Sequence, residues 1–254
     1  AMTTPLSFDT LASRAKIAVI VPATNTVVQP EMEAMRPHGV TNHVSRMLLP
    51  PRPYDDMQAY QQALKTEKGQ LEEALALVMP CEPHAVAHGH SIHSFRGDLQ
   101  RAQAEEARLQ ALAGIPFVTP SIAVLEGLKA IGNPKRIGVL TPYWPPADAI
   151  IAEFFTACGF EVVASHGLKS TGPISVAQFT PEQIMQGFEA LDKPQVQALV
   201  HVGTNLPVSA MTPAIEAHFG KPLIGVNVAT YWLALRRLGL RDAMPGFGIL
   251  AEQH

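Results

Sequence analysis

Four short polar segments of the sequence have the residue types needed to bind a small carboxylate. Each follows an apolar run and supplies hydroxyl, amide or backbone N–H donors, without a lysine, an arginine or an acidic side chain. Such donors stabilise an anion, and helix N-termini add partial positive charge. Capping of a following helix is the simpler interpretation of any one segment, but four segments in matching positions favour binding. The segments are residues 22–26, 89–91, 141–143 and 203–205.

Within these segments, His90 is the side chain suited to proton transfer. It follows a glycine at a predicted strand end, and imidazole titrates near neutral pH, so His90 is the candidate acid/base and His88 a second candidate. The three nearby histidines His88, His90 and His93 also raise the question of a metal site. The spacing is not specific and no carboxylate motif accompanies it, so we predict no metal site. Structural roles are expected for His93 and His201.

The two cysteines are expected to be structural. Cys81 precedes a predicted strand and Cys158 ends a predicted helix, which places both at the end of the sheet opposite the polar segments. Two cysteines in 254 residues indicate a reducing compartment without a disulfide framework. A cytoplasmic location is therefore expected.

The polar segments lie in a regular alternation of short apolar runs and amphipathic stretches, which is typical of parallel sheets covered by helices. A basic residue, an apolar strand and a proline occur at residues 16–22 and again at 136–142. A strand that leads into glycine and polar residues occurs at 84–92 and again at 198–206. We therefore predict an α/β protein of two pseudo-symmetric Rossmann-like lobes, each a parallel sheet flanked by helices, with the site in the interlobe cleft. The predicted lobes are residues 1–118 plus 226–254 and residues 119–225.

The composition is that of a globular protein and limits the possible partners. The chain is 47% hydrophobic and 16% charged, with a net charge of −3. Scattered charge of this size produces no field that holds a polyanion, so neither nucleic acid nor an anionic membrane is an expected partner. No apolar run reaches the length that spans a bilayer, and residues 1–14 lack the pattern of a signal peptide.

Several motifs resemble the aspartate/glutamate racemase superfamily, and within it the group of maleate cis-trans isomerases and arylmalonate decarboxylases. The resemblance runs almost end to end, through residues 21–26, 94–97, 119–125, 136–143, 203–206 and 245–248. It implies a cofactor-independent enzyme, a homo-oligomer, and paired thiols that face each other across the cleft. Carried over residue by residue, it implies that the carboxylate is held by Asn25, Ser91, Tyr143, Thr204 and Asn205, together with backbone groups at Gly89 and Gly203.

No thiol is present at the positions where the resembled proteins carry one. The second-lobe position is Gly203, and the first is Gly89 or His90, depending on whether the motif at 94–97 or the strand is aligned. We therefore expect an isomerase or lyase, similar to the racemases, isomerases and decarboxylases, that acts on a small carboxylic acid with His90 as acid/base. The alternatives are a non-catalytic carboxylate-binding protein and a hydrolase that uses histidine-activated water.

Overall fold

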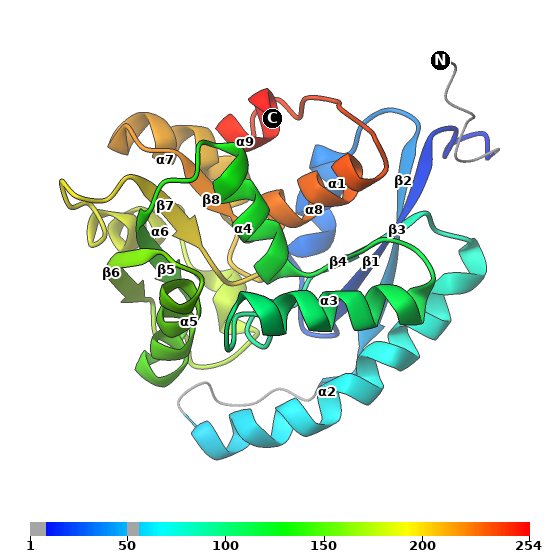
Figure 1. The fold of residues 1–254 in the computed structure, drawn as a ribbon, viewed down its shortest axis with the longest axis horizontal. Coiled ribbons are helices and arrows are strands. Elements are labelled where there is room, and N and C mark those ends of the chain that lie inside the picture. Colours follow the sequence, from blue (N-terminus) through cyan, green and yellow to red (C-terminus); the bar gives the residue numbers. More distant parts are fainter. Residues whose placement is uncertain (1–8, 50–55) are drawn as a thin grey trace.

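The computed structural model describes residues 9–49 and 56–254, which form two parallel four-stranded sheets with helices on their faces (Figure 1). The strand orders are β2-β1-β3-β4 and β6-β5-β7-β8, so the predicted α/β class with two similar lobes is confirmed. Residues 1–8 and 50–55 of the predicted first lobe lie outside the described residues. The strands are β1 (Ala15–Pro22), β2 (Val40–Met47), β3 (Ala85–His88), β4 (Phe117–Val118), β5 (Arg136–Thr141), β6 (Glu161–Gly167), β7 (Ala198–His201) and β8 (Leu223–Gly225).

The helices fill the connections between consecutive strands, as parallel pairing requires. The connecting helices are α1 (Val28–Met35), α2 (Met57–Val78), α3 (Leu99–Ala113), α4 (Pro120–Ala130), α5 (Pro145–Ala157), α6 (Pro181–Glu189) and α7 (Thr212–Phe219). Two more helices, α8 (Val226–Arg237) and α9 (Ile249–Gln253), follow the last strand. Short 3₁₀ turns add η1 (Met79–Cys81), η2 (Ser175–Gln178) and η3 (Ser209–Met211).

The central strands are apolar throughout because both faces of each sheet are covered. All eight residues of β1 are buried, as are all four of β3 and of β7. A strand of this kind reads as a continuous hydrophobic run rather than an alternating one. One large buried cluster extends over both lobes, and a smaller cluster lies on the outer side of each sheet.

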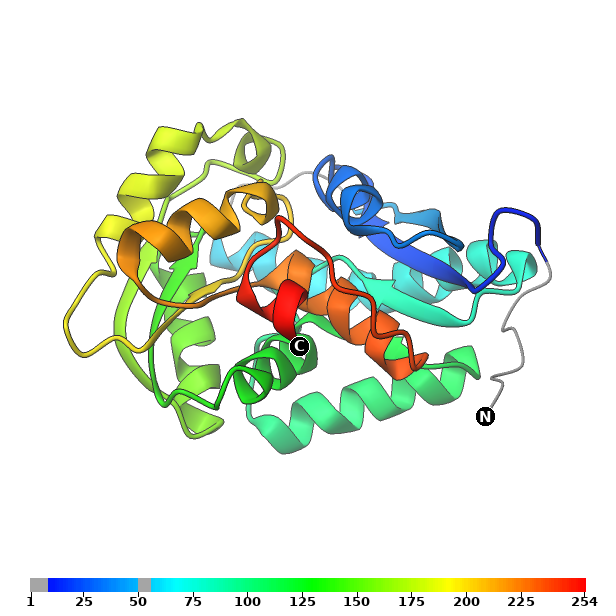
Figure 2. The same ribbon diagram turned by 90° about the horizontal axis from the view of Figure 1, so that it is seen from above.

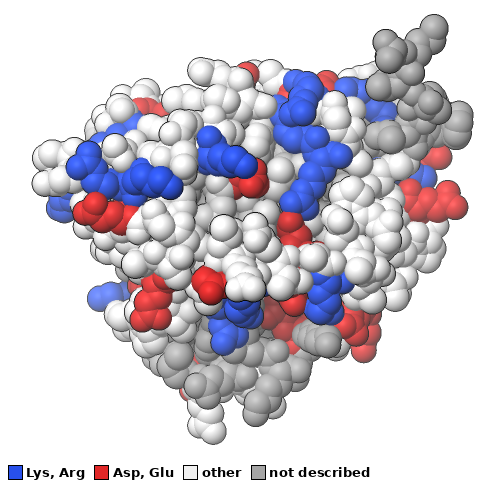
Figure 3. Space-filling model, in the orientation of Figure 1, with Lys and Arg blue, Asp and Glu red and all other residues white. Residues whose placement is uncertain are grey.

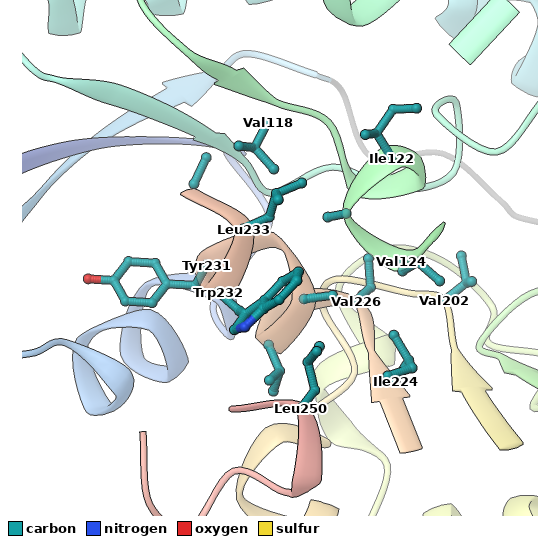
Figure 4. Packing of buried hydrophobic residues seen from close by; sticks show 14 of the residues in the cluster. Val118, Ile122, Val124, Val202, Ile224, Val226, Tyr231, Trp232, Leu233 and Leu250 are labelled. Atoms are coloured by element: carbon teal, nitrogen blue, oxygen red, sulfur yellow. The ribbon is translucent and has the colours of Figure 1, made fainter. Parts of the chain in front are cut away.

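Two helices, α4 and α8, join the lobes. Nearly all of α8 is buried, and it contacts β3 and β4 of the first sheet and β8 of the second (Figure 2). In Figure 4, Trp232 and Leu233 of α8 lie among Val118 of the first sheet and Ile224 of the second. The strands of each sheet fall within the predicted lobe ranges. The assignment of residues 226–254 to the first lobe stays a prediction, because α8 packs on both sheets.

The register of the sheets defines which residues of the two lobes are equivalent. His88 pairs with Ile20 on β1, and His201 pairs with Leu140 on β5. Ile20 and Leu140 each lie two residues before the proline that the repeat shares. The next backbone hydrogen bonds also match, since the residues after His88 and His201 donate to Ile20 O at 2.7 Å and Leu140 O at 2.9 Å. His88 is therefore the counterpart of His201, and His90 is the counterpart of Gly203.

Acidic and basic side chains both occur across the face drawn in Figure 3. No helix within the described ranges is at once long and apolar enough to cross a membrane.

Candidate functional site

A small pocket lies between the lobes, at the carboxyl ends of β1, β3, β5 and β7. Its volume of about 40 Å³ is room for a group the size of a carboxylate, since one water needs about 10–15 Å³ on the same measure. Ligands of parallel sheets are expected at this edge. The pocket is lined by Pro22, Thr24, Asn25, Leu49, His90, Pro142, Tyr143, Pro173, Val176, Gly203, Thr204 and Asn205.

Hydroxyl and amide groups from the two lobes meet directly in this region. The Asn25 amide nitrogen donates to Thr204 Oγ1 at 3.3 Å. The hydroxyls of Ser91 and Tyr143 are 3.2 Å apart, and the Thr204 N–H donates to Ser91 Oγ at 3.3 Å. These contacts are longer than the usual hydrogen bonds between such groups. Little free energy is therefore lost when the donor groups form hydrogen bonds to a bound anion instead. Ser91 is fully buried behind the lining rather than part of it.

The two asparagines of the pocket also hold the backbone in place. The Asn25 side-chain oxygen accepts from the N–H groups of Val27 and Val28, at 3.0 and 2.9 Å, and so supports the start of α1. Asn205 accepts from Thr26 N at 2.9 Å and donates to the Pro173 carbonyl at 2.8 Å. Helix capping and ligand binding are thus compatible for Asn25, because its amide nitrogen points to the pocket residue Thr204 while its oxygen serves the helix.

His90 lines the pocket and is bonded to a carboxylate that lies outside it. His90 Nδ1 is 2.8 Å from Glu67 Oε1, and Glu67 Oε2 also contacts His93 Nδ1. All three side chains are about nine-tenths buried. A carboxylate on one imidazole nitrogen fixes the tautomer and orientation of the ring. Glu67 comes from α2 and precedes His90 by 23 residues, and no local sequence pattern marks the pair.

His88, the second predicted catalytic residue, does not line the interlobe pocket. It ends β3, where its ring packs edge-on against Phe117 at 5.9 Å. Burial lowers the pKa of His88 to about 3, so the ring is neutral. His201 is equally buried, and burial lowers its pKa to about 3 as well. Its place in the sheet agrees with the expected structural role.

The two glycines named as binding residues differ in their positions. Gly89 is absent from the pocket lining, and its N–H is used by the sheet. A side chain at Gly89 would come within 2.7 Å of Val21 Cγ1. Gly203 lines the pocket with a backbone φ of +148°, and a Cβ there would lie 2.4 Å from Pro142 Cδ. Close packing explains glycine at both positions.

The thiols are remote from the pocket. Cys81 lies in η1 and Cys158 follows the last turn of α5, and neither lines the pocket. Burial raises the pKa of Cys158 to about 11 and that of Cys81 above its ordinary value. Both are therefore protonated, and poor nucleophiles, at neutral pH.

Two further features escaped the sequence analysis. Within the described residues, Glu67, His88 and His90 offer potential metal-ligand atoms that all lie within 4.8 Å of one another. On the second-lobe side, the Glu31 carboxylate of α1 accepts from Ser209 N at 3.0 Å and from Asn227 Nδ2 at 2.7 Å. Burial raises the pKa of Glu31. Asn227 also donates to the Thr204 carbonyl at 2.9 Å, so this contact braces the pocket.

The two-lobed architecture is a class of α/β fold that is shared with solved structures. A maleate cis-trans isomerase of Nocardia farcinica, solved with a covalently bound succinylcysteine intermediate, superposes with a TM-score of 0.85 at 23% identity, over 94% of this chain and 99% of that one. A liganded variant of arylmalonate decarboxylase superposes with a TM-score of 0.79 at 21% identity, over 94% and 100%.

The sequence comparison identifies the family. The family model described as arylmalonate decarboxylase matches residues 17–251, so the chain belongs to this family. The maleate isomerase of Pseudomonas putida is 29% identical over 249 residues, which is 92% of this chain and 96% of that protein. The arylmalonate decarboxylase of Bordetella bronchiseptica is 28% identical over 170 residues, or 65% and 69% of the two chains. The resemblance to isomerases and decarboxylases is thereby confirmed.

Proposed function

We propose that this chain is a cofactor-independent isomerase or lyase that acts on a small carboxylic acid without a catalytic cysteine. The substrate carboxylate accepts hydrogen bonds from Tyr143, Thr204 and the Asn25 amide in the interlobe pocket. His90 is the acid/base. Family membership supports this reaction class, because the relatives include maleate isomerases and an arylmalonate decarboxylase.

The observation that carries the proposal is the register of the two sheets. His90 and Gly203 occupy equivalent positions after β3 and β7, and both line the pocket. By the resemblance, racemases carry thiols in both of these positions and decarboxylases in the second-lobe position alone, whereas this chain has an imidazole in the first and glycine in the second. One proton-transferring group is sufficient for a decarboxylation or a proton shift, while a two-thiol racemisation needs two.

Two balanced steps are open to His90. In a proton shift, the neutral Nε2 takes the proton from the carbon next to the carboxylate, and the bonding electron pair moves onto the carboxylate oxygens. In a decarboxylation, carbon dioxide leaves without the bonding pair, and Nε2–H gives its proton to the carbanion. In both steps, Glu67 accepts from Nδ1–H and the neutral donors stabilise the charge that develops.

The test compares His90→Ala with wild type on maleate, an arylmalonate and a panel of other mono- and dicarboxylates. We expect the turnover of the best substrate to fall about 100-fold or more, with KM nearly unchanged. The double variant Cys81→Ser/Cys158→Ser is the matched control and retains wild-type turnover. Normal turnover in His90→Ala, or its loss in the double-cysteine variant, contradicts the proposal.

A hydrolase is the second candidate, because a carboxylate-bonded imidazole is also suited to activate water. A panel of amides and esters of the same acids distinguishes it from the first. Thermal stabilisation by carboxylates without any product indicates instead a protein that binds and does not catalyse.

A further inference from the structure

We propose that Glu67, His88 and His90 bind one divalent first-row transition ion, such as Zn²⁺, behind the interlobe pocket. The proposal goes beyond the proposed function, which uses no metal. It assigns a ligand to a cluster of three buried side chains, of which the proposed reaction uses His90 and Glu67 but not His88.

The spacing of the three side chains approaches that of a metal site. Ligand atoms at 2.0–2.2 Å from Zn²⁺ lie about 3–3.5 Å from one another. His90 Nδ1 and Glu67 Oε1 are already 2.8 Å apart, and no separation within the group exceeds 4.8 Å. Shifts of about 1 Å at the ends of the side chains would bring the three ligand atoms to coordinating distances and leave a fourth position for water.

His88 supplies the observation that points to a ligand. Its Nε2 is buried and has no hydrogen-bond partner among the described residues. A buried polar atom without a partner costs free energy. The ring is neutral, so its lone pair is available to an ion. A metal bond to Nε2 would satisfy an atom that has no partner among the described residues.

The second lobe contains the natural comparison. His201 has the same place in its sheet, and its Nε2 is also buried without a described partner. The cluster at His88 is the one group within the described ranges that brings three possible ligands together. An unpartnered imidazole alone therefore does not indicate a metal, and the convergence of Glu67 with two histidines does.

The donor set and its surroundings select the type of ion. Two imidazoles and one carboxylate suit zinc, nickel, cobalt or iron, whereas magnesium and calcium prefer oxygen ligands alone. His93 on the other Glu67 oxygen adds the kind of second contact that orients a ligating carboxylate. A second hollow, which shares no lining residue with the interlobe pocket, reaches two of the three proposed ligands. Its volume is about 390 Å³, and the side chains that line it include Glu67, His88, His93, Arg96, Arg101 and Arg108.

A bound ion would also change what His90 can do. Coordination occupies the Nδ1 lone pair, so the remaining proton of the neutral ring sits on Nε2. His90 then donates a hydrogen bond from Nε2 but no longer accepts a proton there. The metal-bound and metal-free forms are thus expected to differ in their ability to remove a proton from a substrate.

The experiment measures metal binding directly on the full-length untagged chain. The protein is stripped with EDTA, dialysed, and titrated with Zn²⁺ in competition with a chromophoric chelator, and Co²⁺ is added separately to record visible absorption. We expect one ion per chain, with Glu67→Gln and His88→Leu each weakening Zn²⁺ binding about 100-fold or more. Glu67→Gln preserves the shape of the side chain, which keeps the test valid if His88→Leu does not fold.

The matched control is His201→Leu, which removes an equally buried imidazole from the second lobe. It is expected to bind Zn²⁺ as wild type does. The proposal is overturned if wild type binds no more tightly than Glu67→Gln, or if His201→Leu loses binding to the same extent. Because the readout is binding and not turnover, this outcome leaves the proposed function untouched, and failure of the carboxylate panel leaves the metal site untouched.

Discussion

The two lobes share a sheet topology, and each has a buried histidine at the end of the equivalent strand, His88 on β3 and His201 on β7. The residues that follow these strands nevertheless place different chemical groups at the pocket. After β3, the first lobe places His90 at the pocket, and it brings ligand atoms of Glu67, His88 and His90 within 4.8 Å of one another. After β7, the second lobe places Gly203 and then hydroxyl and amide groups at the same edge.

This difference shows that a repeated backbone arrangement can place different side chains at equivalent positions. The backbone repeat supplies two equivalent strand ends, so the position of the pocket follows from the architecture. The side chains then differ: the first lobe adds the imidazole of His90 to its hydroxyl and amide groups, whereas the second lobe has Gly203 at the equivalent position. Helix α2 adds to this difference, because its Glu67 carboxylate contacts His90 Nδ1.

Adding a side chain at the second-lobe counterpart of His90 is expected to have the largest effect. Gly203→Ala places a Cβ 2.4 Å from Pro142 at a φ of +148°. Backbone strain and overpacking together are expected to lower the free energy of unfolding by about 3–5 kcal/mol. The measurement is urea-induced unfolding followed by circular dichroism.

Gly159→Ala is the control for this prediction. Gly159 also has a positive φ, of +85°, but a Cβ there meets nothing within 4 Å. Its expected cost is about 1–2 kcal/mol, from backbone strain alone. Equal losses in the two variants would show that contact with Pro142 is not what requires glycine at position 203.

The buried His201 of the second lobe is expected to make the free energy of unfolding depend on pH. His201 is neutral in the folded protein because burial lowers its pKa to about 3, whereas in the unfolded chain it is protonated below about pH 6.5. Its contribution to stability is therefore complete above pH 6.5 and is lost as the pH falls from there towards 3. Between pH 7 and pH 5 the loss is about 2 kcal/mol.

His201→Leu removes this contribution to the pH dependence. Unfolding free energies of wild type and variant at pH 7 and pH 5 give the result. We expect the wild-type protein to lose about 2 kcal/mol more than the variant over this interval. Identical losses would mean that His201 is not held neutral by burial.

A smaller effect is expected when the carboxylate of the first lobe is neutralised. With EDTA present, Glu67→Gln is expected to lower kcat about 10-fold and to leave KM nearly unchanged, because it disturbs the orientation of His90 and not the carboxylate contacts. Steady-state kinetics on the best substrate of the panel measure both constants.

Glu106→Gln is the matched control, since Glu106 is another buried carboxylate that serves a structural contact, with Thr119 and Arg237. It is expected to reduce stability while kcat stays the same. A role of Glu67 limited to stability would instead give both variants the same unchanged kcat.

Much of the binding half of the candidate site was predictable from local sequence. Asn25, Tyr143, Thr204 and Asn205 all line the pocket, because strand ends of parallel sheets collect at one edge. The sequence repeat paired Gly89 with Gly203, and the sheets instead pair His90 with Gly203. A shift of one residue is easily missed in a repeat of short strands, since apolar runs match equally well in either alignment.

Taken by itself, the sequence determined the fold class, the two-lobe repeat, the edge at which the pocket lies and the family. These properties depend on local patterns, such as apolar runs between helices, prolines at strand ends and polar segments after strands. Tertiary structure alone decided that Glu67 meets His90, that His88 turns away from the pocket, and that Gly203 cannot carry a side chain. Those outcomes depend on how α2 packs on its sheet and how closely Pro142 approaches β7, and such distances between remote segments arise only when the whole core is assembled.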